Sequence, residues 1–363
     1  MIRKLKRCLG RPFRRLAWGL LRRYGRKRPY SVVFWLFYGQ YVSAAAYSVL
    51  RLGIPDLLRE GPRSAQDLAR ATGVHPLSLS RLMRALASID LFERLDGDRY
   101  ALTPYSELLC RDHEDSLYGW GNFCGMLTLP ELPAMPDCLE TGCSAPECLY
   151  GMQIWDYLSK EAAKGKAFDA CMAGFTKSHV AAILAAYDFS ACNRIVDVGG
   201  GRGALLSAVL KACPGLNGTL YDREPVMDAA RQTLEEAGVA DRGKAVAGNF
   251  LESVPEGADL YIIKHVLHDW DDENAVTILT NIARAMKPSS KLLIMSGMVE
   301  HAISKGEVFR EWWDIAQWFH TGGRERTPAL FEELAVRAGL RIESISPTRV
   351  PDVVILQAVR QDA

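Results

Sequence analysis

From residue 194 to the end of the chain, two hydrophobic patterns alternate. Short runs of β-branched and other apolar residues are typical of buried strands, and the segments between them repeat apolar residues every three or four positions, as packed helices do. The predicted strands are 194–198, 216–221, 244–247, 258–266, 291–299, 341–348 and 353–359, and the predicted helices include 204–213, 271–286 and one that opens at Thr327 and Pro328. This alternation predicts a doubly wound, Rossmann-like α/β sheet that ends in an antiparallel hairpin and binds its ligand at the carboxyl ends of the strands.

Residues 52–110 show a different pattern, in which two short helices precede a small hairpin. The predicted elements are a capped helix from Ser64 to Gly73, a helix over 76–88 and strands over 92–95 and 99–102. This order is typical of a winged helix-turn-helix, a fold that often binds DNA. The second helix carries only Arg81 and Arg84 as cations, whereas a helix that reads a DNA groove usually carries more. The pattern therefore favours a role in dimerisation or as a substrate lid.

The segment 116–180 is predicted to be helical and contains many bulky side chains. Four prolines, at 130, 133, 136 and 146, are predicted to break its middle into loop. Most of the bulky side chains are expected in a core, and some are expected to line an apolar cavity.

The stretch Ser31 to Leu50 contains no charged residue and is long enough to cross a bilayer. Gln40, the spaced tyrosines and serines and the run Ala44 to Ala46 argue against a membrane span. The prediction is a helix buried in an interface, with a membrane span as the alternative. A secretory signal is disfavoured because the uncharged run is too long.

The charge of the chain is unevenly distributed. The 363 residues carry a net charge of +1, but residues 1–28 hold about twelve Lys and Arg and no acid, so the remainder is net acidic. This basic arm fits either an amphipathic helix on an anionic membrane or nucleic acid, or a disordered solubilising tail. The nine cysteines do not indicate disulfides, and the even spacing of Cys138, Cys143 and Cys148 does not suit zinc, so no metal is predicted.

A glycine cluster follows the first predicted strand of the sheet. Asp197 precedes Gly199, Gly201 and Gly203, and a helix begins directly after them, so the chain makes a tight turn into a helix N-terminus with free N–H groups. The spacing differs from the dinucleotide fingerprint, and an acid at the turn suits an ammonium or sulfonium group better than phosphates. Asp222, at the end of the next strand, can accept from both ribose hydroxyls. The pattern predicts an adenosine-type ligand, either a nicotinamide cofactor or S-adenosylmethionine.

Four motifs follow one another along the chain: Asp-Val-Gly-Gly-Gly-Arg-Gly at 197–203, Asp222, His-Asp-Trp at 268–270 and Gly-Gly-Arg-Glu-Arg-Thr at 322–327. From about Tyr30 to its end the chain resembles the S-adenosylmethionine-dependent O-methyltransferases of the caffeic acid and acetylserotonin type, which include bacterial natural-product enzymes. The last two motifs carry the specific part of this resemblance. It implies a class I methyltransferase sheet, an N-terminal winged-helix dimerisation domain and a homodimer.

The resemblance also implies a site for S-adenosylmethionine. The residues that it places there are Asp197, Gly199, Gly201, Gly203, Asp222, Asn249, Phe250 and Lys264. Asn249 stands where the family has an acid that meets the adenine amine. Its side-chain oxygen can still accept a hydrogen bond from that amine.

His268 matches the catalytic base of the family, and the chemistry agrees. Methyl transfer from a sulfonium mainly needs positioning, but a hydroxyl acceptor must also lose its proton, and histidine titrates near neutral pH. Glu325 matches one of two glutamates that orient this base, and Ser296 replaces the other. We therefore expect the imidazole to be supported on one side only. His320, just before the glycine pair, is a second candidate near the site.

The resemblance implies a flat, largely apolar acceptor. Its contacts fall on Trp155, Phe168, Met172, Phe175, Gln317 and Trp318. The predicted function is methylation of a hydroxyl on an aromatic or polyketide-like small molecule in secondary metabolism. One alternative keeps the cofactor but changes the chemistry, to N- or C-methylation or a reaction without methyl transfer. The other is a DNA-binding regulator that senses S-adenosylmethionine.

Four parts are predicted along the chain. They are a basic arm at 1–29, a winged-helix-like dimerisation domain at 30–110, a helical connector with the substrate pocket at 111–190, and the S-adenosylmethionine-binding methyltransferase domain at 191–363. We expect a cytoplasmic enzyme that binds no nucleic acid. Peripheral membrane contact through residues 1–28 is the alternative location.

Overall fold

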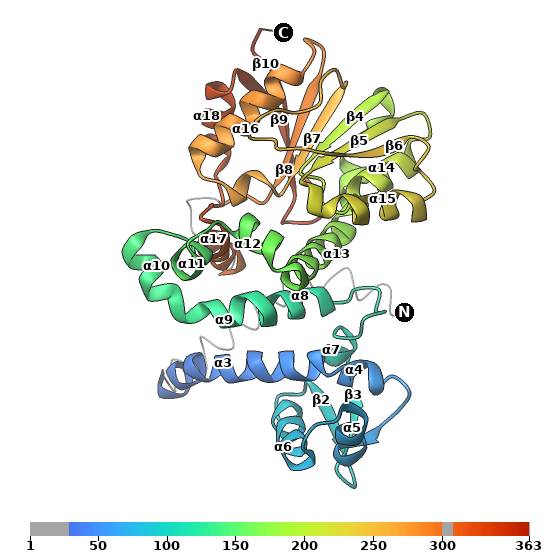
Figure 1. Cartoon of the computed structure of the whole chain (residues 1–363), viewed down its shortest axis with the longest axis vertical. Helices are drawn as coiled ribbons and strands as arrows, with labels where there is room; N and C mark the ends of the chain where they lie inside the picture. Colours follow the sequence, from blue (N-terminus) through green and yellow to red (C-terminus); the bar gives the residue numbers. More distant parts are fainter. Residues whose placement is uncertain (1–28, 300–307, 363) are drawn as a thin grey trace. The chain divides into compact units, whose positions relative to one another are not determined.

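The computed structural model describes residues 29–299 and 308–362, and the predicted basic arm lies outside them (Figure 1). The described chain divides into two compact units, with a boundary between Leu129 and Pro130. Each unit has a hydrophobic core of its own.

The first unit contains the predicted helices and hairpin. Its elements are α3 (Pro29–Arg51), α4 (Ile54–Leu57), β1 (Arg63–Ser64), α5 (Ala65–Thr72), α6 (Pro76–Ala87), β2 (Phe92–Leu95), β3 (Arg99–Leu102), α7 (Pro104–Glu107), α8 (Tyr118–Phe123) and the π-helical turn η1 (Cys124–Thr128). The three strands form an antiparallel sheet in the order β1-β3-β2. The Ser64 side chain caps α5 by accepting from the backbone N–H of Asp67, as its sequence predicts.

The uncharged stretch after residue 30 forms α3, and most of its side chains are exposed in the single chain. Only Val49 and Leu50 are buried, whereas Tyr30, Leu36 and Phe37 are each at least 70% exposed. Within the described residues, no helix has both the length and the apolar character needed to cross a membrane.

The second unit begins with a series of short helices, and the predicted proline-broken loop is wrong. The elements are α9 (Leu129–Glu131), η2 (Leu132–Ala134), α10 (Met135–Thr141), α11 (Ala145–Tyr150), α12 (Ile154–Lys160) and the long α13 (Ala162–Ala186). Pro133, Pro136 and Pro146 each lie in the first turn of a helix, where the missing N–H has no helical partner to lose. These prolines therefore start helices, while Gly142 and Gly151 end α10 and α11.

The second unit continues into the predicted doubly wound sheet. Its strands are β4 (Arg194–Val198), β5 (Asn217–Asp222), β6 (Gly243–Ala247), β7 (Leu260–Lys264), β8 (Lys291–Ser296), β9 (Leu340–Pro347) and β10 (Val354–Arg360). Their order is β6-β5-β4-β7-β8-β10-β9, with the first five parallel and β10 antiparallel to both of its neighbours. This topology confirms the predicted α/β sheet and its terminal hairpin. The strand order reverses between β4 and β7, which is where a ligand of such a sheet binds.

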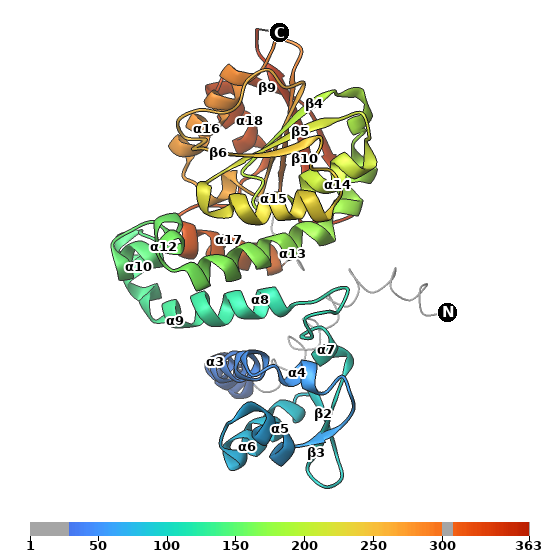
Figure 2. The same cartoon turned by 45° about the vertical axis from the view of Figure 1, so that its right-hand side comes forward.

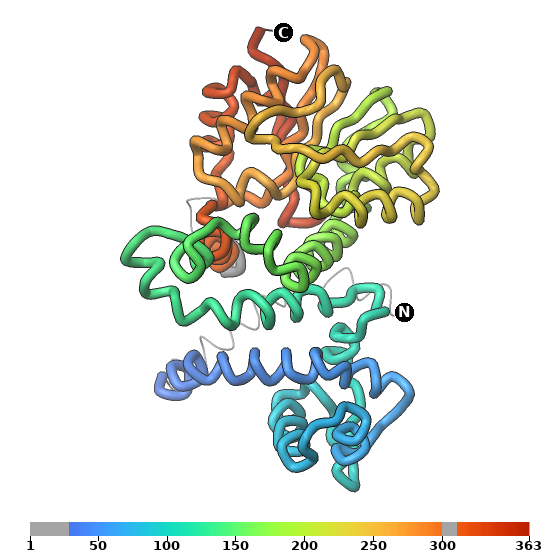
Figure 3. The backbone as a smooth tube through the Cα atoms, viewed as in Figure 1, coloured from blue at the N-terminus to red at the C-terminus, as the bar shows by residue number. Residues whose placement is uncertain are grey.

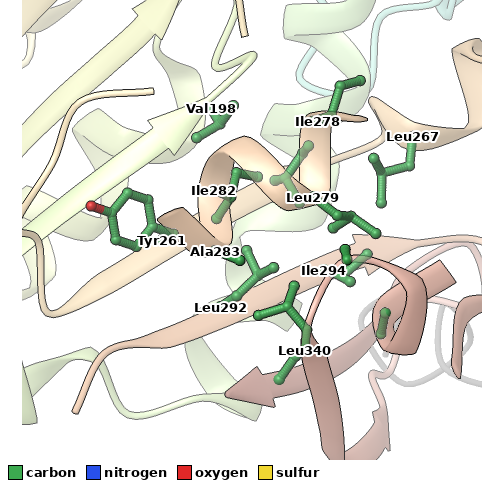
Figure 4. Close-up of a cluster of buried hydrophobic side chains, with 14 of the residues drawn as sticks. Val198, Tyr261, Leu267, Ile278, Leu279, Ile282, Ala283, Leu292, Ile294 and Leu340 are labelled. Carbon is green, nitrogen blue, oxygen red and sulfur yellow. The ribbon is translucent and has the colours of Figure 1, made fainter. Parts of the chain in front are cut away.

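Helices cover both faces of this sheet (Figures 1 and 2). One face packs against α14 (Ala204–Ala212) and α15 (Met227–Glu236), and the other against α16 (Asp272–Ala285) and α18 (Pro328–Arg337). Figure 4 shows Ile278 and Ile282 of α16 over Leu292 and Ile294 of β8. Burying such a side chain contributes about 1.5–3 kcal/mol, so these layers hold the strand ends in place.

The remaining helices of the second unit lie at the end of the sheet where the parallel strands finish (Figure 3). Lys264, the last residue of β7, donates to Thr176 of α13 over 3.3 Å, and Trp155 of α12 stacks on Trp270. The helix α17 (Val308–Thr321) lies beside α13, because the rings of Phe175 and Trp313 are in edge contact at 5.8 Å. The sheet therefore supplies one wall of a site and the helices the other.

Candidate active site

The turn after β4 requires its glycines. Gly199, Gly201 and Gly203 have positive φ angles of 70°, 55° and 79°, which other residues adopt only at a cost. A Cβ at Gly199 would lie 2.6 Å from a methyl group of Val266, so the turn also passes close to the chain that leaves β7. The backbone turn at the switch point of the sheet therefore requires the glycines of this motif.

Two buried carboxylates border this turn. Asp222 accepts hydrogen bonds from the backbone N–H groups of Gly201 and Arg223, both over 2.7 Å, on separate oxygens. Asp197 is 2% exposed, and its Oδ2 has no partner among the described residues. Burial, followed by the charge of Asp222, raises the pKa of Asp197 to about 7. The acids fit the positively charged, hydroxyl-bearing S-adenosylmethionine, because a nearby cation favours ionised carboxylates.

Lys264 is the last residue of β7, and Asn249 lies two residues after the end of β6. Burial lowers the pKa of Lys264 to about 8, against the opposing charge of Asp197. Asn249 is exposed, and its side-chain oxygen accepts from the backbone N–H of Leu251 over 3.0 Å. A carbonyl oxygen has a second lone pair, so this turn leaves Asn249 able to accept from an adenine amine.

Aromatic rings form a continuous row beside the cofactor residues. Phe250 meets the edge of Trp270 at 5.8 Å, Trp270 stacks on Trp155 at 6.2 Å, and Trp155 meets Phe168 at 5.6 Å. Met172 lies one turn beyond Phe168 on the same side of α13. The row thus joins predicted cofactor residues to predicted acceptor residues.

His268 and Glu325 form a buried pair. His268 is 4% exposed, and its Nδ1 lies 2.7 Å from Oε1 of Glu325, while its Nε2 lies 3.7 Å from Oδ1 of Asp269. Burial alone would lower the pKa of His268, but the charges of Glu325 and Asp269 outweigh it and hold the pKa above its ordinary value. With Nδ1 bound to a carboxylate, the neutral ring presents Nε2 as its proton acceptor.

The two segments that carry this pair are locked together. Arg326 is fully buried and donates to the backbone oxygens of Leu267 and Trp270 and to the carboxylate of Asp272. A Cβ at Gly323 would lie 2.0 Å from the backbone oxygen of His268, so only glycine allows this contact. The Gly-Gly-Arg-Glu-Arg-Thr motif therefore places Glu325 against His268 by direct backbone contact.

Ser296, the last residue of β8, is buried and contributes no charge. Ser296 is 2% exposed, and neither its hydroxyl nor Oε2 of Glu325 has a hydrogen-bond partner among residues 29–299 and 308–362. His268 is thus held by Glu325 alone on its Nδ1 side.

Two residues that the sequence analysis did not predict, Trp313 and Asp269, contact the predicted acceptor residue Gln317. The Gln317 amide, in the orientation that satisfies both its groups, donates to Asp269 over 3.0 Å and accepts from the indole of Trp313 over 3.3 Å. Trp313 was overlooked although it lies one helical turn before Gln317, a spacing that could have identified it. Asp269 does not cap the helix that follows it, because Asp271 makes the cap of α16.

Trp318 points elsewhere. It packs with a buried cluster around Cys138 and Phe319 on another side of α17, apart from Trp313 and Gln317. His265, at a left-handed φ of 52°, stacks on His179 of α13 at 5.6 Å, and burial lowers the pKa of both rings. Within the part of the chain that the structure describes, no three His, Cys, Asp or Glu residues are grouped as metal ligands.

Two family models match the chain. The O-methyltransferase domain matches residues 140–341, and the O-methyltransferase dimerisation domain matches residues 34–112. The mitomycin biosynthesis 6-O-methyltransferase of Streptomyces lavendulae is 36% identical over 324 residues, which cover 89% of this chain and 92% of the relative. The 8-amino-8-demethylriboflavin N,N-dimethyltransferase of Streptomyces davaonensis is 34% identical over 313 residues, with 84% and 88% covered.

A solved structure of a methyltransferase also matches this chain. An O-methyltransferase from neocarzinostatin biosynthesis, in complex with S-adenosylmethionine and 2-hydroxy-5-methyl naphthoic acid, aligns with a TM-score of 0.78 and 31% identity. The alignment covers 88% of this chain and 96% of that structure.

Proposed function

The chain belongs to the O-methyltransferase family, with S-adenosylmethionine as its cofactor, and from that premise we propose that it methylates a hydroxyl of an aromatic or polyketide-like small molecule with His268 as the general base. The supporting observation is the buried His268–Glu325 hydrogen bond of 2.7 Å beside the glycine turn. Several relatives are named for O-methylation of such molecules, in keeping with this acceptor class.

The geometry is compatible with a role for each of these residues. S-adenosylmethionine supplies an electrophilic methyl group when bound. Asp222 and the glycine turn would hold its ribose and methionine parts, and the aromatic row from Phe250 to Phe168 would cover its adenine side and meet the acceptor. His268 would accept the hydroxyl proton at Nε2, and Glu325 would stabilise the resulting imidazolium.

Incubation of the purified chain with S-adenosylmethionine and a panel of phenols and naphthols tests this proposal. Mass spectrometry should detect an acceptor that gains one methyl group, together with S-adenosylhomocysteine. His268→Ala should abolish this product while calorimetric binding of S-adenosylhomocysteine persists. A wild-type chain that binds the cofactor but methylates no hydroxyl would contradict O-methylation.

Methylation of nitrogen is the second candidate. One observation favours it: Ser296 leaves His268 with a single carboxylate partner, and a relative at 34% identity is named as an N,N-dimethyltransferase. An amine can be neutral before it reacts, so it needs positioning more than a base. Activity on an aromatic amine that survives His268→Ala would favour this candidate.

We further infer a homodimer through residues 30–110, whose helix pair and hairpin have the order of a winged helix. The dimerisation domain matches residues 34–112, and α3 exposes a continuous series of aromatic side chains, which usually marks an interface. A cytoplasmic location and the four-part division at 29, 110 and 190 belong to the same proposal. Sedimentation of the full chain tests the dimer.

A further inference from the structure

A second histidine–carboxylate pair lies in the same unit, separate from His268 and Glu325. Glu131, at the end of α9, is 1% exposed, and its Oε2 lies 3.2 Å from Nδ1 of His320, which is 7% exposed. Both side chains are removed from water, where charged and polar groups ordinarily remain unless they have partners. The proposed methyl transfer uses neither residue.

Glu131 is only partly satisfied by this contact. Its second oxygen, Oε1, has no hydrogen-bond partner in the described ranges 29–299 and 308–362. A buried carboxylate oxygen without a hydrogen-bond donor destabilises the protein. The presence of such an oxygen in Glu131 therefore indicates a ligand that supplies the donor.

The charge of Glu131 also acts on Tyr150, which belongs to a group of polar side chains on α11, α12 and α13. The rings of Tyr150 and Tyr157 stack at 4.1 Å, their hydroxyls are hydrogen-bonded, and Lys164 donates to Tyr157. Burial, followed by the bond to Tyr157 and a smaller effect of Glu131, raises the pKa of Tyr150 to about 12. Tyr150 therefore remains neutral, and the charge of Glu131 contributes to this.

The helix α17 connects this pair to the reacting end of the site. Trp313, Gln317 and His320 are spaced by four and three residues, so they share one face of the helix. Gln317 is bonded to Asp269, which lies beside His268. His320 is three residues further, about 4.5 Å along the helix axis. An aromatic acceptor can place its hydroxyl at His268 and its ring along this face of α17. The far side of its ring system then extends toward His320.

We propose that Glu131 and His320 bind a second hydrogen-bond-donating substituent of the acceptor, a hydroxyl or amine on the side of the ring system remote from the methylated hydroxyl. This inference rests on the proposed function for the direction in which the acceptor lies. Glu131 accepts the donor at Oε1, and His320 keeps the carboxylate oriented through Oε2. The pair thus selects acceptors that carry two polar groups over those that carry one.

Binding to the chain saturated with S-adenosylhomocysteine tests the pair without requiring turnover. The probes are 1-naphthol and 2-naphthol against dihydroxynaphthalenes with the second hydroxyl at each ring position, measured by calorimetry. At least one dihydroxy isomer should bind about ten- to a hundred-fold more tightly than its naphthol, as expected for a hydrogen bond to a charged group. In Glu131→Met this advantage should fall to within about two-fold, with naphthol binding retained.

Glu140→Met, which alters an exposed acid of the neighbouring α10, is the matched control and should keep the full advantage. If Glu131→Met loses its native circular dichroism, His320→Phe provides the second test and should also reduce the advantage. The inference is wrong if no dihydroxy isomer binds better than its naphthol, or if the advantage survives in both variants. Selective binding without methylation would instead overturn the proposed function and leave the inference standing.

Discussion

The cofactor end and the acceptor end of the second unit are built by different means. At the cofactor end, glycines with positive φ and the N–H groups that meet Asp222 define the geometry, so the backbone makes most of the site. At the proposed acceptor end, side chains from α11, α12, α13 and α17 would make the walls. A backbone site tolerates few substitutions, whereas a wall of side chains can change one residue at a time. The cofactor is therefore fixed while the acceptor can vary, and substitutions should separate the two ends.

His268→Ala is expected to have the largest effect and to be confined to the acceptor end. Loss of a general base lowers kcat by about 10²–10⁴-fold. The calorimetric Kd of S-adenosylmethionine should change little, since the proposed cofactor contacts do not include His268. A comparable loss of cofactor affinity would show that the two ends are not separable.

Asp222→Ala should produce the reverse pattern, with a loss at the cofactor end. The carboxylate accepts from Gly201 and Arg223 and is expected to hold the ribose, so its removal should weaken S-adenosylmethionine binding by at least about 30-fold. KM for the acceptor, measured at saturating cofactor, should stay within about two-fold. Unchanged cofactor affinity in calorimetry would contradict the assigned role of Asp222.

Glu325→Gln should shift the pH profile of kcat/KM. His268 accepts a proton only when neutral, so activity rises with pH through its pKa, which lies above the ordinary 6.5. Removing the negative charge of Glu325 disfavours the imidazolium, so the acidic limb should move to lower pH while the plateau rate falls about ten-fold or more. A limb that does not move would exclude His268 as the titrating group.

Trp313→Leu should raise KM for the acceptor by about three- to ten-fold through lost ring contact with Phe175. The neighbouring Trp312 is 65% exposed, so Trp312→Leu is the matched control. Equal effects from both variants would place Trp313 outside the acceptor wall.

Ser296→Ala is expected to have the smallest effect. The hydroxyl has no partner among the described residues, so its removal should change kcat less than about three-fold and the free energy of unfolding by less than about 1 kcal/mol. A large fall in kcat would show that the Ser296 hydroxyl does the work of the second glutamate that the resemblance implies.

The contrast between the two ends also explains what the sequence could predict. The alternation of strands and helices, the terminal hairpin and the motifs that contain Gly199, Asp222, His268 and Glu325 could be recognised from local patterns and spacing. The helices between residues 129 and 150 were missed because proline was interpreted only as a breaker, although the first turn of a helix accepts it. Glu131 gave no local signal, because its role depends on a contact with His320, which lies far away in the chain.

The backbone contact at Gly323 has a consequence for exchanging parts between relatives. Gly323 and Arg326 meet the main chain around His268, but Arg326 also binds Asp272, and the backbone N–H of Glu325 donates to Asp314. A segment between residues 271 and 321 taken from a relative should therefore keep the base and the acid aligned only if it retains these two carboxylates. Exchange of the other positions of that segment should alter the choice of acceptor and leave this alignment intact.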